Sequence, residues 1–184
     1  IVHAWPEDAD KSSKQRTFIR KLKYELEQKN FKVICDFEYY NKISLKRFMG
    51  ENLSNSDVIV PICDEIYFER SLIHTSGATY ELELIVENNY LDKLIPIKIE
   101  ECKLPQIFGS IEYTSFFKEY SNQRINEDSV AMGDFYKRLA TLLKDTELFP
   151  KDRIIEQVER EIDSLGIING LINKNDLLLS DIYV

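Results

Sequence analysis

One acidic side chain stands where a helix could present it to a ligand. The stretch "SGATYELELIVENNY", residues 76–90, places four apolar residues on one helical face: Ala78, Leu82, Ile85 and Val86. At about 100° per residue, Glu83 and Glu87 project away from that face and Glu81 lies at its edge. We therefore expect Glu81 in the first turn of a helix and half-sheltered. Glu81 either takes part in a reaction there or only interacts favourably with the helix dipole.

Two loops carry further groups that could bind a ligand. The first follows "IVHA" and the second follows "FKVIC"; together they hold His3, Ala4, Trp5, Glu7 and Asp8, then Asp36, Tyr39 and Tyr40. The Trp5 ring offers a flat surface on which a base or nicotinamide can stack, or it caps the core at a strand end. The acidic residues and tyrosines are either ligand contacts or ordinary loop residues. His3 ends a buried strand, and we expect it to have a structural role.

Composition excludes several classes of function. The net charge of −8 argues against a non-specific nucleic-acid binder and against an anionic membrane surface. With six glycines, neither a P-loop nor G-x-G-x-x-G is present, which excludes the usual phosphate cradles. Neither His3 nor His74 accompanies a recognisable Ser or Cys nucleophile, so a hydrolase triad is unsupported. No set of metal ligands is evident.

The cysteines indicate the compartment. Cys35, Cys63 and Cys102 are odd in number and widely spaced, which fits neither a disulfide framework nor a zinc site. We expect buried, reduced thiols and a cytoplasmic protein. No apolar run approaches the roughly 18 residues of a membrane span, and no secretory signal is visible.

Short β-branched runs alternate with helical periods along the chain. The runs predict five strands, within residues 1–4, 31–35, 57–63, 93–99 and 112–117. A capping box at Ser12 opens a helix that carries Phe18 and Leu26. Ser44 caps a second helix through about Leu53. The Glu81 helix and a helix over residues 130–143 complete the pattern.

This alternation predicts an α/β fold: a flavodoxin-like parallel sheet of five strands, in the order 2-1-3-4-5, with helices on both faces. Ligands bind such sheets beyond the carboxyl ends of the strands, in the crevice between the first and third strands. We expect Glu81 at that crevice. Residues 1–148 form the domain, and residues 149–184 form a helical extension that docks on the domain or on a partner.

Five segments, in order, resemble those of prokaryotic Toll/interleukin-1 receptor (TIR) domains. They are "IVHAWPED", "FKVICDFEYYNKIS", "NSDVIVPICDEIYFERS", "GATYELELI" and "LIPIKIE", and the likeness spans about Ile1 to Leu143. The fourth is similar to the bacterial G-x-x-Y-E variant of the segment that carries the family's catalytic glutamate. Gly77 and Ala78 stand where other members have Trp and Cys.

The resemblance implies an enzyme that cleaves the nicotinamide–ribose bond of NAD⁺, giving ADP-ribose or a cyclic form that signals in bacterial antiviral defence. Glu81 would be catalytic. The residues expected to bind the substrate are His3, Ala4, Trp5, Asp8, Asp36, Tyr39, Tyr40 and Tyr80. NAD⁺ is then a substrate, and no cofactor or metal is required. The expected partners are further copies of the chain and a protein of the same defence system, with no nucleic acid and no membrane.

Two other classes remain open. One is a non-catalytic TIR adaptor that self-associates through the loop at residues 36–44. The other is a phospho-acceptor receiver domain on the same sheet, with Glu7 and Asp8 as the acidic pair, Asp64 as acceptor and Lys118 after the fifth strand. A receiver needs its acidic pair directly against the first strand to hold Mg²⁺, whereas Trp5 and Pro6 intervene here.

Overall fold

The computed structural model describes residues 1–35 and 45–144 of the 184-residue chain. These residues belong to one compact unit, Ile1–Thr146. The loop at residues 36–44 and the extension at residues 149–184 lie outside the described residues, so the expectations for them stay predictions. No helix in the described ranges is long and apolar enough to cross a membrane.

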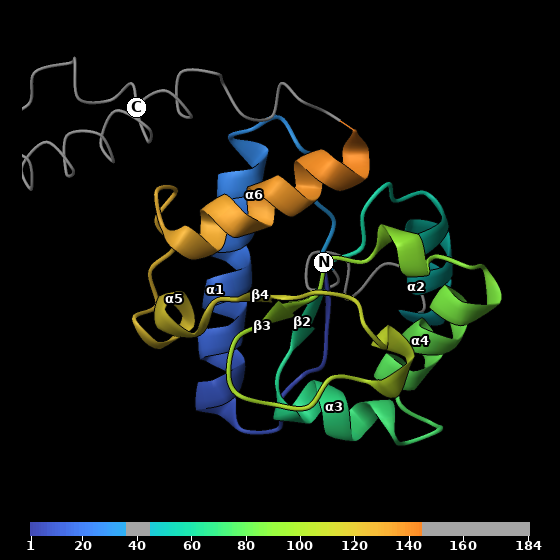
Figure 1. Cartoon of the computed structure of the whole chain (residues 1–184). Helices are drawn as coiled ribbons and strands as arrows, with labels where there is room; N and C mark the ends of the chain where they lie inside the picture. The colour runs from blue at the N-terminus through green and yellow to red at the C-terminus, as the bar shows by residue number, and fades with distance from the viewer. Residues whose placement is uncertain (36–44, 145–184) are drawn as a thin grey trace, which may run out of the picture. The chain divides into compact units, whose positions relative to one another are not determined.

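A parallel sheet forms the centre of this unit (Figure 1). Its strands are β1 (Val2–His3), β2 (Pro61–Cys63), β3 (Ile97–Lys98) and β4 (Thr114–Ser115), hydrogen-bonded in that order. The register pairs His3 with Ile62, Ile62 with Ile97, and Ile97 with Thr114. The predicted α/β fold with a parallel sheet is therefore confirmed, with strands shorter than the apolar runs that signal them.

The expected second strand is not formed. Residues 31–35 have no regular secondary structure, so the order is that of the predicted strands 1, 3, 4 and 5. The segment still runs beside β1, because the Ile1 nitrogen donates a hydrogen bond of 2.8 Å to the Ile34 carbonyl oxygen. The structure assigns no strand ladder to residues 31–35. The apolar pattern of "FKVIC" thus indicates a place in the sheet but not strand geometry.

Six α-helices and two short 3₁₀ turns connect the strands within the described ranges. The helices are α1 (Ala9–Glu27), α2 (Leu45–Ser54), α3 (Glu65–Ser71), α4 (Gly77–Glu87), α5 (Phe117–Ser121) and α6 (Val130–Leu143), and the turns are η2 (Leu91–Lys93) and η3 (Gln106–Phe108). Helices α1 and α5 pack together on one side of the sheet, and α2 and α4 pack together on the other (Figure 1). Sequence analysis did not anticipate α3 or α5.

The start of one helix differs from the expectation, and so does the helical turn that holds Glu81. Helix α1 begins at Ala9 because the Asp8 carboxylate accepts a hydrogen bond of 2.7 Å from the Lys11 backbone N–H; the cap is therefore Asp8 and not Ser12. Helix α4 is capped by Ser76, whose hydroxyl accepts from the Thr79 N–H at 3.0 Å. Glu81 is the fifth residue after this cap, so it belongs to the second turn and not the first.

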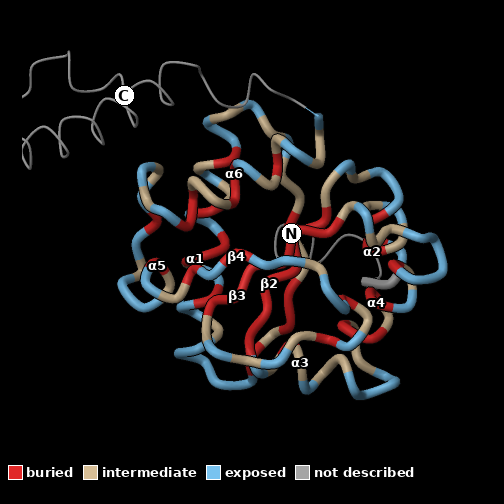
Figure 2. The backbone as a smooth tube through the Cα atoms, viewed as in Figure 1, coloured by how far each residue is buried: buried red, intermediate tan, exposed pale blue. Residues whose placement is uncertain are grey.

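The core lies on both faces of the sheet, and the strands themselves are buried (Figure 2). On the α1 side, aromatic rings meet edge to face: Phe116 lies 5.7 Å from Phe18 and 6.0 Å from Phe135 between ring centroids. Such contacts add to the stabilisation from buried area. They join β4, α1 and α6 through three side chains that are almost wholly excluded from water.

Replacing Phe135 tests this aromatic cluster. Phe135→Ala should lower the free energy of unfolding by about 3–5 kcal/mol, because it removes a fully buried ring and leaves a cavity. Val130→Ala is the matched control on the same helix; Val130 is 91% exposed, so its loss should change stability by less than about 0.5 kcal/mol. Urea unfolding followed by circular dichroism measures both. Equal effects would contradict the assignment of the core.

Candidate functional site

Glu81 is buried: its exposed fraction is 4%. Sequence spacing placed it half-sheltered at the edge of an apolar face. The structure buries a wider face of α4 because α2 and α3 both pack against this helix. That face comprises Ala78, Thr79, Glu81, Leu82 and Ile85. A carboxylate is therefore withdrawn from water, which is a costly arrangement unless polar groups surround it.

A small cavity adjoins the Glu81 side chain. It is lined by residues of the chain start, of α2 and of the segment before β2: Ile1, Val2, Ile34, Phe48, Met49, Asn52, Leu53, Ser56, Val58, Ile59 and Glu81. Its volume of about 30 Å³ is room for about two water molecules. A nicotinamide ring does not fit there unless side chains such as Phe48 and Met49 move aside.

Tyr67 of α3 is an electrostatic neighbour of Glu81. Burial raises the pKa of the Tyr67 phenol well above its ordinary value, and the charges of Glu81 and Cys63 raise it further. The ring is fully buried and shares an apolar cluster with Ala78 and Leu82 of α4. Sequence analysis did not single out Tyr67. The signal was present as the Tyr of "CDEIYFERS", within a segment that resembles the corresponding segment of TIR domains.

Side-chain hydroxyls join the end of α3 to the start of α4. The Thr79 hydroxyl has three backbone acceptors within reach: the carbonyl oxygens of Arg70 at 3.0 Å, Ser71 at 3.2 Å and Ile73 at 2.7 Å. The Ser76 hydroxyl also donates to the Arg70 carbonyl. Carbonyl groups at a helix C-terminus lack partners within the helix, so these hydroxyls satisfy them. Tyr67 and Glu81 are thereby held on two helices that are joined to each other.

The residues after β1 divide between the two faces of the sheet. Ala4 belongs to the apolar cluster on the α4 side. His3 and Trp5 form an edge-to-face pair, with ring centroids 4.5 Å apart, and the Arg16 guanidinium of α1 lies 4.2 Å from the Trp5 ring centre. The Arg16 contact places the Trp5 ring beside α1, whereas Glu81 lies on α4.

Of the remaining expected substrate-binding residues, Asp8 is exposed and caps α1. Tyr80 precedes Glu81 on α4 and is half-buried. Asp36, Tyr39 and Tyr40 lie outside the described residues. Glu7, from the same loop as Asp8, forms an ion pair with Arg70 of α3 at 3.2 Å, which links the exit of β1 to the end of α3.

Asp64, rather than Glu81, lies at the carboxyl end of β2, next to the expected crevice. Its side chain is buried, caps α3 by accepting from the Tyr67 N–H at 2.7 Å, and accepts from the Gln15 amide of α1 at 3.1 Å. Burial raises its pKa to about 6; the Tyr67 N–H bond and Lys11 oppose the shift, and Glu100 adds to it. In the described ranges, no three His, Cys, Asp or Glu side chains are placed to hold a metal ion.

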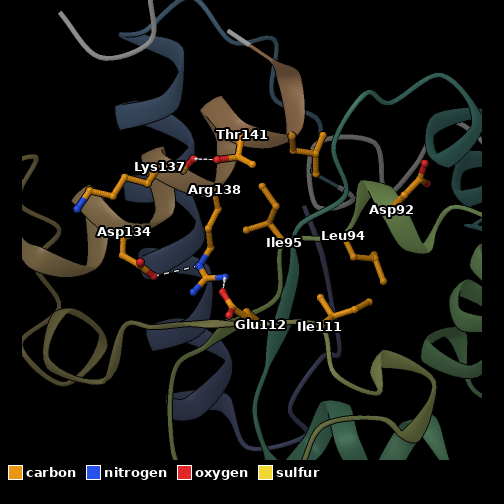
Figure 3. A pocket seen from close by; sticks show the side chains of 10 residues that line it. Asp92, Leu94, Ile95, Ile111, Glu112, Asp134, Lys137, Arg138 and Thr141 are labelled. Atoms are coloured by element: carbon orange, nitrogen blue, oxygen red, sulfur yellow. Dashed lines mark hydrogen bonds and ion pairs between the residues drawn. The ribbon is translucent and has the colours of Figure 1, made fainter. Parts of the chain in front are cut away.

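A larger pocket lies at the opposite edge of the sheet, between α6 and the residues that precede β3 and β4 (Figure 3). Its volume is about 480 Å³. Its floor is apolar, with Leu94, Ile95 and Ile111. Ligands of parallel α/β sheets bind beyond the carboxyl ends of the strands, and this pocket is at the amino ends.

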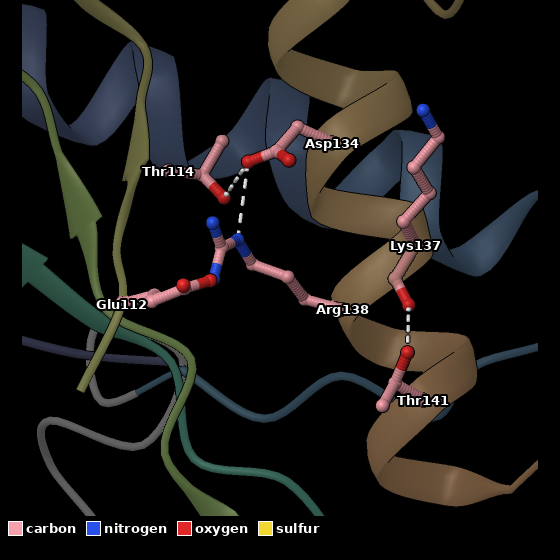
Figure 4. A network of polar contacts seen from close by, with 6 residues as sticks. All are labelled: Glu112, Thr114, Asp134, Lys137, Arg138 and Thr141. Atoms are coloured by element: carbon pink, nitrogen blue, oxygen red, sulfur yellow. Dashed lines mark hydrogen bonds and ion pairs between the residues drawn. The ribbon is translucent and has the colours of Figure 1, made fainter.

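The polar wall of this pocket is already paired. The Arg138 guanidinium donates to Glu112 at 2.8 Å and to Asp134 at 3.1 Å, and the Thr114 hydroxyl donates to the same Asp134 oxygen at 2.9 Å (Figure 4). Two carboxylates therefore neutralise the arginine. The network ties α6 to β4 and to the segment before it, and we assign it a structural role.

Parallel strands, helices on both sides of the sheet and a buried carboxylate on the second helix after β2 define a flavodoxin-like α/β domain. The particular family follows from comparison: the family model described as "TIR domain" matches residues 11–128, and the chain belongs to that family. Neither the curated proteins nor the solved structures gave a match to this chain. The matched region includes Tyr67 and Glu81 and begins after Trp5.

The titration of Asp64 has a consequence for stability. Between pH 4 and 6, the unfolded chain releases the Asp64 proton, for which the ordinary pKa is 3.8, while the folded chain keeps it up to about pH 6. The folded state thus binds more protons, and stability falls as the pH rises through this window. A shift of about two pKa units corresponds to about 2–3 kcal/mol.

Asp64→Asn removes this charge and keeps the helix cap, because Asn and Asp are equally good caps. The variant should be more stable than wild type at pH 7, by about 1–3 kcal/mol, with the difference shrinking toward pH 4. Urea unfolding at several pH values measures the difference. Asp57→Asn, at an exposed carboxylate, is the control and should show no such trend. A gap that is constant with pH would contradict the assignment.

Proposed function

We propose that this TIR domain is an enzyme that cleaves the nicotinamide–ribose bond of NAD⁺, with Glu81 as its catalytic carboxylate. The observation that carries the proposal is Glu81 itself: a buried carboxylate beside a cavity, in the segment that matches the family's catalytic motif and within the matched residues 11–128. Taking a carboxylate out of water at a buried position on α4 is costly, which is consistent with a functional role.

The reaction requires a negative charge near the ribose and does not require a general acid. When the C1′–N bond breaks, its electron pair stays with the nicotinamide nitrogen, which leaves as a neutral molecule. Positive charge then develops on the ribose, as in other glycoside cleavages. An ionised carboxylate held close to the ribose stabilises this charge. Water adds to C1′ and loses a proton to give ADP-ribose, or an adenine nitrogen attacks instead and closes a ring.

The other contributions follow the resemblance. Ala4 lies in the apolar cluster on the Glu81 side of the sheet, and Tyr80 lies on the same helix as Glu81. We propose both as contacts of the substrate. We also propose His3, Trp5 and Asp8 as contacts of the substrate, which then extends over the exit of β1. Asp36, Tyr39 and Tyr40 are proposed contacts from the loop outside the described residues. No cofactor or metal enters this scheme.

The proposed setting is bacterial antiviral defence in the cytoplasm. The chain would act through self-association and with a protein partner of the same system, and it would require neither nucleic acid nor a membrane. These points rest on the family resemblance and on the acidic charge of the chain.

The decisive experiment compares nicotinamide release from NAD⁺ by wild type and Glu81→Gln over a range of protein concentrations. The substitution keeps the shape of the side chain and removes its charge, so the rate should fall about 10²–10³-fold. Glu83→Gln is the matched control, because Glu83 is an exposed carboxylate on the same helix. Its rate should equal that of wild type. Mass spectrometry of the products separates ADP-ribose from a cyclic form.

A wild-type protein that releases no nicotinamide at any concentration would overturn the proposal and favour the non-catalytic adaptor. Equal rates for wild type and Glu81→Gln would show that another residue carries the reaction.

A further inference from the structure

Tyr67 holds a hydroxyl group whose position calls for an explanation. The residue is fully buried, and its backbone N–H is fixed by the Asp64 cap at 2.7 Å. Its hydroxyl has no hydrogen-bond partner among the residues that the structure describes. Buried tyrosine hydroxyls normally find a partner, since losing water without replacement is unfavourable. A phenylalanine would fill the same space without that loss.

The surroundings of this hydroxyl point to Glu81. Helices α3 and α4 pack against each other, and Tyr67 shares its apolar cluster with Ala78 and Leu82, which stand three residues before and one residue after Glu81. Thr79 and Ser76 fix the junction between the two helices. The charge on Glu81 is near enough to raise the pKa of the phenol, on top of the effect of burial. Tyr67 therefore remains an O–H donor at neutral pH.

We propose that Tyr67 is a positioning residue for Glu81: its hydroxyl acts as a donor to the Glu81 carboxylate, at long range in the empty site and through a full hydrogen bond in the occupied one, and keeps that carboxylate ionised and oriented. The inference rests on the proposed function only for its catalytic meaning, because the pairing of the two side chains is a property of the fold. Hydrogen bonds in empty active sites are often long and tighten when substrate binds.

The pairing solves a specific problem. The cavity beside Glu81 is lined largely by hydrocarbon, including Val2, Met49 and Ile59. The ribose cation calls for the charged form of Glu81. A hydrogen-bond donor aimed at a carboxylate favours that form. A neutral phenol does so without introducing a cation that would repel the developing positive charge on the ribose.

The first test needs no substrate. The ¹³C resonance of the Glu81 side-chain carboxyl is followed against pH in wild type and in Tyr67→Phe. Loss of a donor to the carboxylate should move the titration midpoint to higher pH by about one unit. Tyr136→Phe is the control, because Tyr136 is also a buried tyrosine but lies on α6. It should leave the midpoint unchanged. A midpoint that Tyr67→Phe does not move overturns the inference.

The second test uses turnover. Tyr67→Phe should lower kcat for nicotinamide release about 10–100-fold, with little change in KM, and should shift the acid limb of the pH–rate profile to higher pH. The melting temperature should not fall, since no described residue hydrogen-bonds the hydroxyl. A parallel loss of stability and of kcat at all pH values would indicate a purely structural role and overturn the inference.

The two proposals fail in distinguishable ways. If wild type has no activity but Tyr67→Phe moves the Glu81 midpoint, the enzyme assignment fails and the pairing stands. If Tyr67→Phe does not fold, Glu81→Gln provides the reverse measurement. Coupling is reciprocal, so this variant should shift the Tyr67 ¹³Cζ resonance and lower the pH at which the phenol titrates. A Tyr67 resonance that does not respond overturns the pairing.

Discussion

A carboxylate removed from water is the constraint around which one half of this domain is organised. Glu81 is packed beneath α2 and beside α3 on the α4 face of the sheet. The free energy lost when an ion leaves water is several kcal/mol. The other contacts of α4 help to offset this cost: Leu82 and Ile85 are buried, and the helix start is capped by Ser76. Stability is thus supplied on either side of Glu81.

The joint between α3 and α4 gives this arrangement its precision. A helix pair that meets only through apolar side chains can slide, because dispersion contacts have little directional preference. Here the Thr79 and Ser76 hydroxyls donate hydrogen bonds to the backbone carbonyl at the end of α3. The Arg70–Glu7 ion pair extends the connection to the exit of β1. A directional network therefore determines where the side chains of α3 and α4 stand relative to each other, which hydrophobic packing alone does not.

Sequence reasoning predicted the parallel sheet and the order of the four strands that form, because buried strands carry continuous apolar runs, as in "DVIVPIC". The expected second strand is not among them. Sequence reasoning also predicted the α4 start from Ser76. It did not predict that Glu81 is buried. The periodicity of one helix does not show how many other elements pack against that helix. Sequence reasoning also expected Trp5 at the same crevice as Glu81. The composition of a loop does not reveal which face of the sheet each of its side chains contacts. Residues 31–35 look like a strand, yet strand geometry requires partners that a sequence does not display.

The surroundings of Tyr67 and Asp64 were harder to predict for a different reason. Both lie in "CDEIY", where the Tyr resembles an ordinary core aromatic and the Asp was considered only as the acceptor of a receiver domain. Only the fold shows that α1 supplies Gln15 to the carboxylate and that the phenol shares its interior with Glu81.

The small cavity beside Glu81 has a kinetic meaning. A space of about 30 Å³ admits water but no nucleotide, so on the proposed function the conformation described is a resting one. The rate of an enzyme in such a state is the intrinsic rate multiplied by the fraction of molecules that have opened. On the same proposal, a contact that favours the open form accelerates turnover without touching the reacting atoms, and the packing beside Glu81 contributes to latency.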